Sequence, residues 1–331
     1  MVSVQALYIY PVKSCGGVAL DSAVVTPQGL GLWQKKSGVA LPLDRQWCVC
    51  DEDGFVQDIR VQPKMATVTV ELVEGSSHIR LSEPGVSSLT LPVTEDWYTG
   101  SEHPEVIVSD RHKSMWFGRP LTGRCAGAEA ETWITNFIHS HNSIARSEKF
   151  RIVRFMSGTA GTGEVPQRQL SKSFKGKSII AKRAKTNDTA AFADCAPYHL
   201  VSSSSLEDLS RRTAENSSLE LPLATARFRP NIVISGMAPY AEDDCWVLKI
   251  AGCQFRQLGP TGRCVIPTTD PQTGIRNEDE QPRATLMEYR PRPYGDGAHG
   301  GPTFGIWLVP DDVGVEIAIN SEVLKPLTSQ L

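Results

Sequence analysis

The stretch Gln257-Leu-Gly-Pro-Thr-Gly-Arg-Cys-Val-Ile-Pro-Thr-Thr-Asp270-Pro-Gln-Thr-Gly274 is the most informative part of this sequence. Within it, Cys264 directly follows Arg263 on a loop that glycines and a proline open. A positive neighbour favours the thiolate form of a cysteine, and a glycine-rich loop leaves the sulfur accessible. The pattern therefore predicts a soft metal ligand or a nucleophile at Cys264.

Length and charge are typical of an ordinary folded protein. The chain has 331 residues, 40% of them hydrophobic and 21% charged, with a formal net charge of -3. This length exceeds one typical core, so we expect two domains, over 1–156 and 190–331, joined by a basic linker over 157–189. The balanced charge argues against a nucleic-acid binder. No apolar run approaches the roughly 20 residues that span a bilayer and no signal peptide is evident, so we expect a cytoplasmic protein.

Several common kinds of site are excluded by spacing. The eight cysteines form no C-x-x-C pair and no histidine accompanies a cysteine pair, which argues against zinc. There is no G-x-S-x-G elbow, so a hydrolase is disfavoured. In Cys48-x-Cys50, period-2 alternation places both sulfurs on one strand face, where we expect core packing. Cys245 and Cys253 are also expected to be small buried hydrophobes.

The coarse pattern predicts an α+β, strand-rich fold with antiparallel, barrel-like sheets. β-branched and aromatic residues, several in alternation, mark the expected strands at 6–10, 47–50, 66–72, 78–81, 150–155 and 304–309. Apolar residues at helical spacing predict an amphipathic helix over about 129–140. The capping box Ser204-x-x-Glu207 predicts the start of a second helix.

Two segments are predicted to be loops. The linker carries seven positive charges with no acid between them, at Arg168, Lys172, Lys175, Lys177, Lys182, Arg183 and Lys185. A solvated loop is the simpler interpretation of this run, and a docking surface for an acidic partner is the alternative. The stretch 275–301 is rich in proline, glycine and charge, and we expect a long loop there.

Cationic side chains at loop edges are candidates for anion binding. Tyr10-Pro-Val-Lys-Ser-Cys-Gly-Gly17 offers donors from Lys13 and Ser14 on a flexible backbone, and phosphate binding and an ordinary turn remain equal alternatives there. Arg45 and Arg60 are each solvated side chains if considered alone. Arg229-Pro-Asn231 is more specific, because proline fixes the backbone between a guanidinium and an amide.

Four separated segments resemble the amidoxime-reducing component family of the MOSC superfamily. They are Tyr10-Pro-Val-Lys-Ser-Cys15, Asp194-Cys-Ala-Pro197 with Ser204-Leu-Glu-Asp-Leu209 following, Phe228-Arg-Pro-Asn-Ile-Val-Ile-Ser-Gly236 with Tyr240-Ala-Glu-Asp243, and Arg263-Cys264 with Thr268-Thr-Asp-Pro-Gln-Thr-Gly274. They occur in the family's order. The resemblance implies an N-terminal β-barrel-like MOSC domain followed by a MOSC β-barrel domain.

The resemblance also implies a molybdenum cofactor and its ligands. Cys264 would ligate the metal through its thiolate, a soft donor. The phosphate and pterin of molybdopterin would be held by Lys13, Ser14, Arg45, Arg60, Arg229, Asn231 and Arg263. Asp194 and the segment 268–270 fall near the family's cofactor segments without a sharper role. Cys195-Ala196 replaces the Thr-Ser of the animal proteins, which removes two hydroxyls, and only nine residues precede Tyr10, where animal members carry a membrane anchor.

The function implied is reduction of N-hydroxylated compounds such as amidoximes and hydroxylamines, with nitrite reduction to nitric oxide as a side activity. Electrons would come from cytochrome b5 and its NADH-dependent reductase, or from nitrate reductase. The alternative is a MOSC protein that binds the cofactor or transfers sulfur without this turnover, and a pterin-binding scaffold is a third possibility.

Overall fold

The computed structural model describes residues 1–34, 37–111, 120–142, 145, 147–156, 170, 183–215, 219–293 and 300–324. Within these residues the chain forms four β-sheets and three α-helices, so the predicted strand-rich α+β class is confirmed. Among the residues described, no helix has the length and apolar character needed to cross a membrane.

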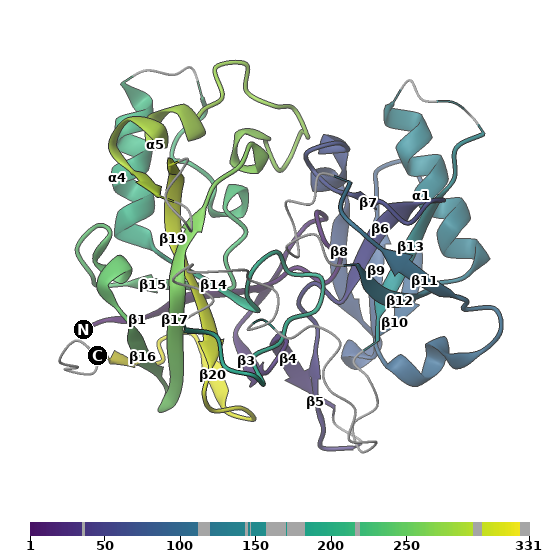
Figure 1. Ribbon diagram of the computed structural model, residues 1–331, viewed down its shortest axis with the longest axis horizontal. Helices are drawn as coiled ribbons and strands as arrows, with labels where there is room; N and C mark the ends of the chain where they lie inside the picture. Colours follow the sequence, from purple (N-terminus) through teal and green to yellow (C-terminus); the bar gives the residue numbers. More distant parts are fainter. Residues whose placement is uncertain are drawn as a thin grey trace.

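The largest sheet has nine strands and draws on both ends of the chain. Its order is β2 (Val18–Leu20), β1 (Ser3–Ile9), β15 (Ile232–Ser235), β14 (Tyr198–Ser202), β19 (Gly300–Pro310), β17 (Cys253–Gly262), β16 (Val247–Ile250) and β21 (Val323–Leu324), with β18 (Pro291–Pro293) beside β19. Most neighbours are antiparallel, as predicted, but β14 and β15 are parallel. In Figure 1 this sheet fills the half that also contains the C-terminal helices.

Three smaller sheets form the other half. One has the order β11 (Glu105–Val108), β12 (Leu121–Cys125), β13 (Phe150–Phe155), β6 (Trp47–Asp51) and β7 (Val56–Gln57). The second has the order β10 (Leu89–Pro92), β9 (His78–Ser82) and β8 (Thr69–Val73), and the third the order β20 (Glu316–Ala318), β3 (Ser22–Thr26), β4 (Gly29–Trp33) and β5 (Ala40–Pro42). Cys48 and Cys50 on β6 are fully buried, which confirms their predicted place in the core.

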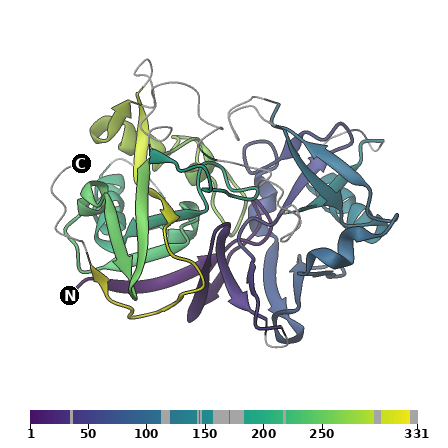
Figure 2. The same cartoon turned by 60° about the horizontal axis from the view of Figure 1, so that its bottom comes forward.

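The two halves are tied together by strands and by a shared core. β1 comes from the start of the chain but pairs with β15, and β20 comes from its end but pairs with β3. One apolar cluster reaches from Trp133 to Ile306. In Figure 2 the start of the chain, drawn in purple, runs from the N-terminus along the larger sheet toward the half with the smaller sheets. The exchanged strands β1 and β20 therefore connect the two halves. The domain limits expected from the sequence stay a prediction.

Of the helices, one was predicted well, one in part and one missed. α1 (Ala128–His141) buries the predicted apolar stripe, including Trp133 and Phe137. α4 (Ser203–Ala214) exists, but the predicted capping box is wrong: Ser202 is the N-cap without a side-chain cap, and Ser204 Oγ donates to Met237 O at 2.7 Å. α5 (Arg283–Tyr289) and β18 lie inside the stretch 275–301, so the predicted long loop is wrong too.

Most of the basic linker lies outside the described residues. Of its seven charged side chains, only Arg183 and Lys185 are described. Arg183 lies over the ring of Trp246, with 3.4 Å from Cζ to the ring centroid, and Lys185 Nζ donates to Asp311 Oδ1 at 2.7 Å. These two charges therefore already have partners within the fold.

Candidate functional site

Seven of the eight predicted site residues line one cavity of about 80 Å³. They come from segments far apart in the sequence and are Lys13, Ser14, Arg45, Arg229, Asn231, Arg263 and Cys264. Lys13 and Ser14 follow β1, and Arg263 and Cys264 follow β17. The fold thus brings together, beside strand ends, residues as far apart in the sequence as Lys13 and Cys264.

The backbone is left-handed at three of these residues. Ser14 has φ 75°, Arg45 has φ 49° and Arg229 has φ 53°. A positive φ is uncommon for residues with a Cβ atom, and such strained positions gather at ligand-binding sites. The strain at this cavity is a first sign that its wall is shaped for binding as well as for stability.

Arg45 and Arg229 share the ring of Tyr10. The Cζ atoms of the two arginines lie 4.5 and 4.2 Å from the ring centroid. Arg45 donates to both carboxylate oxygens of Asp44, at 2.7 and 2.6 Å, and to Arg229 O at 2.8 Å. Aromatic faces attract guanidinium groups, so Tyr10 holds two like charges near each other.

Arg229 remains short of partners. Its Nη2 is buried and has no hydrogen-bond partner among the described residues. Burial, followed by repulsion from Arg45, lowers its pKa to about 10. In the same wall, Thr261 Oγ1 and Trp307 Nε1 are also buried without a partner within the described chain. Buried polar groups are rarely left unsatisfied, so these donors are suited to a ligand.

Lys13 is paired with Asp194 across the cavity. Lys13 Nζ forms an ion pair with Asp194 Oδ1 and donates to Phe192 O at 3.2 Å. Burial favours the neutral acid, but Lys13 and then Arg60 and Arg45 outweigh it and lower the pKa of Asp194 to about 2. The carboxylate is therefore ionised throughout the physiological range.

Arg263 and Asn231 are fixed by the surrounding backbone. Arg263 Nε donates to Phe304 O at 3.0 Å and its Nη1 to Phe228 O at 3.3 Å. The Asn231 amide donates to Tyr8 O at 3.2 Å and accepts from His199 N at 3.0 Å. Asn231 thus lines the cavity, and its side chain connects β1 and β14 through these two hydrogen bonds.

Cys264 is exposed at the cavity, but its thiolate is not favoured. Desolvation by the cavity wall raises the pKa of its thiol above the ordinary value, and the charges of Asp194 and Asp58 raise it further. A hydrogen bond from the Ile266 backbone and the charge of Arg60 lower it, but by less. The expectation of an activated thiolate next to Arg263 is therefore wrong for the protein alone. A metal cation would reverse it, because coordination removes the thiol proton.

Arg60 is the predicted residue that the structure does not bring to the lining. It contacts Asp58, with 2.7 Å between Nη2 and Oδ2, and its Nη2 lies 3.8 Å from Asp110 Oδ1. Its charge still acts on Asp194 and Cys264 at longer range. Asp58 lies only two positions before Arg60, whereas Asp110 is a tertiary partner that the local sequence does not show.

The lining also includes residues to which the sequence assigned no role of their own, among them His199, Arg227, Thr261 and Trp307. Arg227 is buried and pairs with Asp270 at 2.7 Å, and Asp270 accepts from the backbone of Gln272 and Thr273. This gives the segment after Cys264 a structural anchor. A histidine inside the apolar run Tyr198-His-Leu-Val201 was the one available signal for His199.

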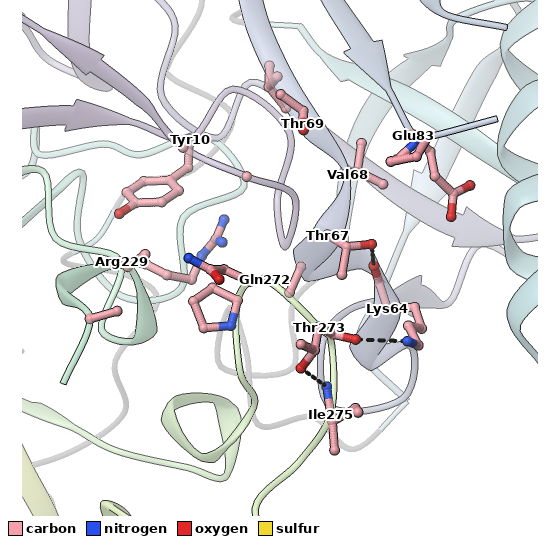
Figure 3. Close-up of a pocket in the computed structure, with 18 of the residues that line it drawn as sticks. Tyr10, Lys64, Thr67, Val68, Thr69, Glu83, Arg229, Gln272, Thr273 and Ile275 are labelled. Atoms are coloured by element: carbon pink, nitrogen blue, oxygen red, sulfur yellow. Dashed lines mark hydrogen bonds between the residues drawn. The ribbon is translucent and has the colours of Figure 1, made fainter. Parts of the chain in front are cut away.

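A larger pocket of about 750 Å³ lies next to the Cys264 cavity and shares Arg229 with it. Figure 3 shows Tyr10 and Arg229 at one end, Glu83 at the other, and Gln272 and Thr273 between them. Lys64 Nζ donates to Thr273 O at 2.8 Å and closes one side. This pocket is the larger of the two, but of the predicted site residues only Arg229 lines it, whereas seven line the smaller cavity.

Comparison with known proteins agrees with this arrangement. The MOSC N-terminal beta barrel domain model matches residues 1–141, and the MOSC domain model matches residues 187–323. Mitochondrial amidoxime-reducing component 1 of Homo sapiens is 31% identical over 94% of this chain and 80% of its own length. Mitochondrial amidoxime reducing component 2 of Rattus norvegicus is 30% identical over 87% of this chain and 72% of its own length. The chain belongs to the MOSC-domain family that includes the amidoxime-reducing components.

Proposed function

We propose that this protein is an oxidoreductase that reduces N-hydroxylated compounds at a molybdenum cofactor held in the Cys264 cavity. The relatives' names support the reaction class. The observation that carries the proposal is the meeting of an exposed thiol with four cationic side chains from separate segments. One of them, Arg229, has a buried nitrogen without a hydrogen-bond partner among the described residues.

The residues present suit an anionic pterin cofactor. Lys13, Arg45, Arg229 and Arg263 supply positive charge for a phosphate, and Arg229 Nη2 and Thr261 Oγ1 are donors still to be satisfied. The cavity is smaller than the roughly 300–1,000 Å³ of common ligand pockets, so binding has to move side chains of its wall. The Lys13–Asp194 pair is the contact that a phosphate would replace.

In this account, Cys264 supplies the protein's bond to molybdenum, and a soft thiolate suits that metal. When bound, the cofactor would supply the two-electron chemistry that removes oxygen from an N–OH group. The arginines neutralise the phosphate, the ring of Tyr10 packs against the guanidinium groups of Arg45 and Arg229, and Asp194 offers a negative charge near Cys264. Nitrite reduction to nitric oxide at the same site is a further proposed activity.

Electrons would come from cytochrome b5 and its NADH-dependent reductase, or from nitrate reductase. The sequence contains no Rossmann or P-loop motif of its own, which is compatible with a terminal acceptor. The basic linker is the proposed docking segment for an acidic donor, and most of it lies outside the described residues. The relatives' names carry the word mitochondrial, and the cytoplasmic location expected from the sequence stays a prediction.

The test uses protein expressed in cells that make the cofactor. Molybdenum and pterin are measured per chain, and benzamidoxime reduction is then followed with cytochrome b5, its reductase and NADH. The proposal predicts near-stoichiometric molybdenum and turnover. Bound cofactor without turnover would favour the alternative of a cofactor-handling MOSC protein, and protein without molybdenum contradicts both.

A further inference from the structure

His199 is a buried histidine that belongs to none of the motifs that predict the site. It lies on β14 and lines the Cys264 cavity, with 2% of its surface exposed. A buried imidazole needs hydrogen-bond partners, so its contacts indicate what the fold uses it for. Those contacts lead to Arg263 and Asn231, two of the predicted cofactor residues.

The imidazole is a hydrogen-bond acceptor for Arg263. Arg263 Nη2 donates to His199 Nε2 and, at 2.5 Å, to Phe304 O. A guanidinium has no acceptor atom, so the contact between the two side chains requires a lone pair on Nε2. Burial, reinforced by the charges of Arg263 and Arg45, lowers the pKa of His199 well below its ordinary value. The ring is therefore neutral, and accepting from Arg263 at Nε2 requires its proton to be on Nδ1; the only competing contact of Nε2 among the described residues is a long one, 3.4 Å from Phe304 O.

The backbone of His199 holds the second residue. His199 N donates to Asn231 Oδ1 at 3.0 Å, and Asn231 N donates to His199 O at 2.8 Å. This closed pair of hydrogen bonds ties β14 to the start of β15. A single residue thus connects two strands and the loop after β17, on which Arg263 lies.

The space for the imidazole comes from Gly305 on β19. A Cβ atom at Gly305 would lie 2.6 Å from His199 Nε2, and the backbone there has φ +74°. Trp307, on the same strand, packs against the imidazole with ring centroids 5.4 Å apart. The ring is confined by both neighbours, so its acceptor nitrogen has a fixed direction.

We propose that His199 is a positioning residue: its imidazole accepts a hydrogen bond that aims the Arg263 guanidinium at an anionic group bound beside Cys264. The inference rests on the proposed function, because it takes Arg263 to be a cofactor ligand. Without this acceptor, Arg263 keeps its bonds to backbone oxygens but loses its contact with the β14 side chain. A long side chain then samples other orientations, and cofactor affinity falls.

The test measures how fast molybdenum and pterin leave the purified holoprotein after dilution, by metal analysis and by fluorescence of the oxidised pterin. His199→Leu removes the acceptor, and we expect about tenfold faster loss, because about 1.4 kcal/mol corresponds to a factor of ten. His199→Gln offers an amide oxygen instead and should stay within about threefold of wild type. The control His103→Leu removes another buried histidine, which contacts Cys125 O at 2.9 Å, and should retain the wild-type rate.

A double-mutant cycle separates positioning from general damage. If His199 acts through Arg263, His199→Leu has no further effect once Arg263→Gln is present, so the double variant loses cofactor at the rate of Arg263→Gln alone. The inference is overturned if His199→Leu keeps its cofactor as wild type does, or if the two effects multiply. Wild-type protein without any molybdenum overturns the proposed function first.

The tautomer gives a second measurement that needs no folded leucine variant. In ¹⁵N spectra of histidine-labelled wild-type protein, the signal that disappears in His199→Gln should belong to a neutral ring with an unprotonated Nε2. A protonated Nε2 would mean that the ring does not accept from Arg263, and the inference would be wrong.

Discussion

The guanidinium of Arg229 lies over the ring of Tyr10, 4.2 Å from its centroid, while its buried Nη2 has no hydrogen-bond partner among the described residues. Arg45 lies over the same ring at 4.5 Å. Asp44 pairs with Arg45, but Arg229 Nη2 contacts no anion among the described residues, so two like charges lie close together with one carboxylate between them to compensate. An arrangement that costs stability in the empty protein becomes favourable once an anion binds.

Arg229→Gln should therefore weaken cofactor binding while sparing the apoprotein. Loss of one charge-assisted contact is worth about 2 kcal/mol, or roughly thirtyfold in affinity. We expect substoichiometric molybdenum together with a melting temperature close to wild type, since repulsion from Arg45 is also removed. The matched control is Arg80→Gln, a half-buried arginine on β9 that does not line the cavity. Full loading of the Arg229 variant would contradict the assignment.

The Lys13–Asp194 pair predicts a pH dependence. Asp194 has a folded pKa of about 2, below the unfolded value of roughly 3.9, so its ionised form stabilises the protein above that value and the contribution is lost as pH falls toward 2. Lys13→Met should flatten this loss, because Arg60 and Arg45 alone depress the pKa less. Urea unfolding between about pH 2.5 and 5 measures it, with exposed Lys249→Met as the control. Equal pH profiles for the wild type and Lys13→Met would argue against the pair.

Cys48 tests the opposite case, a cysteine with no part in the chemistry. It is fully buried on β6, and burial raises the pKa of its thiol well above the ordinary value. Cys48→Ala should lower the free energy of unfolding by on the order of 1 kcal/mol and leave turnover per folded molecule unchanged. A large fall in turnover with normal stability would show that the core assignment is wrong.

The basic linker tests the electron donor. Replacing Lys172, Lys175 and Lys177 with glutamine should slow cytochrome-driven turnover at low ionic strength, because positive charge steers an acidic partner. Dithionite-driven turnover should not change. Salt should reduce the difference, since exposed charges are screened beyond roughly 8 Å at physiological ionic strength. If the triple variant matches wild type at low salt, the linker is a solvated loop.

The fold was predictable where a local pattern decided it. The apolar spacing at Trp133 and Phe137 gave α1 nearly its observed limits, and alternation placed Cys48 and Cys50 in the core. α5 was missed because seven residues are too short to show helical periodicity. The predicted capping box failed because Ser204 found a tertiary acceptor, the backbone of Met237, which no local pattern shows.

The site was predictable as a set of residues but not as an arrangement. The family motifs identify seven residues that line one cavity. The left-handed backbone at Ser14, Arg45 and Arg229 depends on the tertiary arrangement of the strands and loops around them, which no motif shows. The raised pKa of Cys264 also could not be inferred, because it comes from desolvation by the cavity wall and from Asp194 and Asp58, far away in the sequence. His199 was missed because its partner Arg263 is 64 positions away.

The most direct test of the central claim is Cys264→Ala, made in cells that supply the cofactor. Cys264 is exposed and contributes little packing, so the variant should fold with a wild-type melting temperature. Without the thiolate ligand it should lose benzamidoxime reduction. No turnover above background is expected. Turnover near wild type with molybdenum still bound would contradict it.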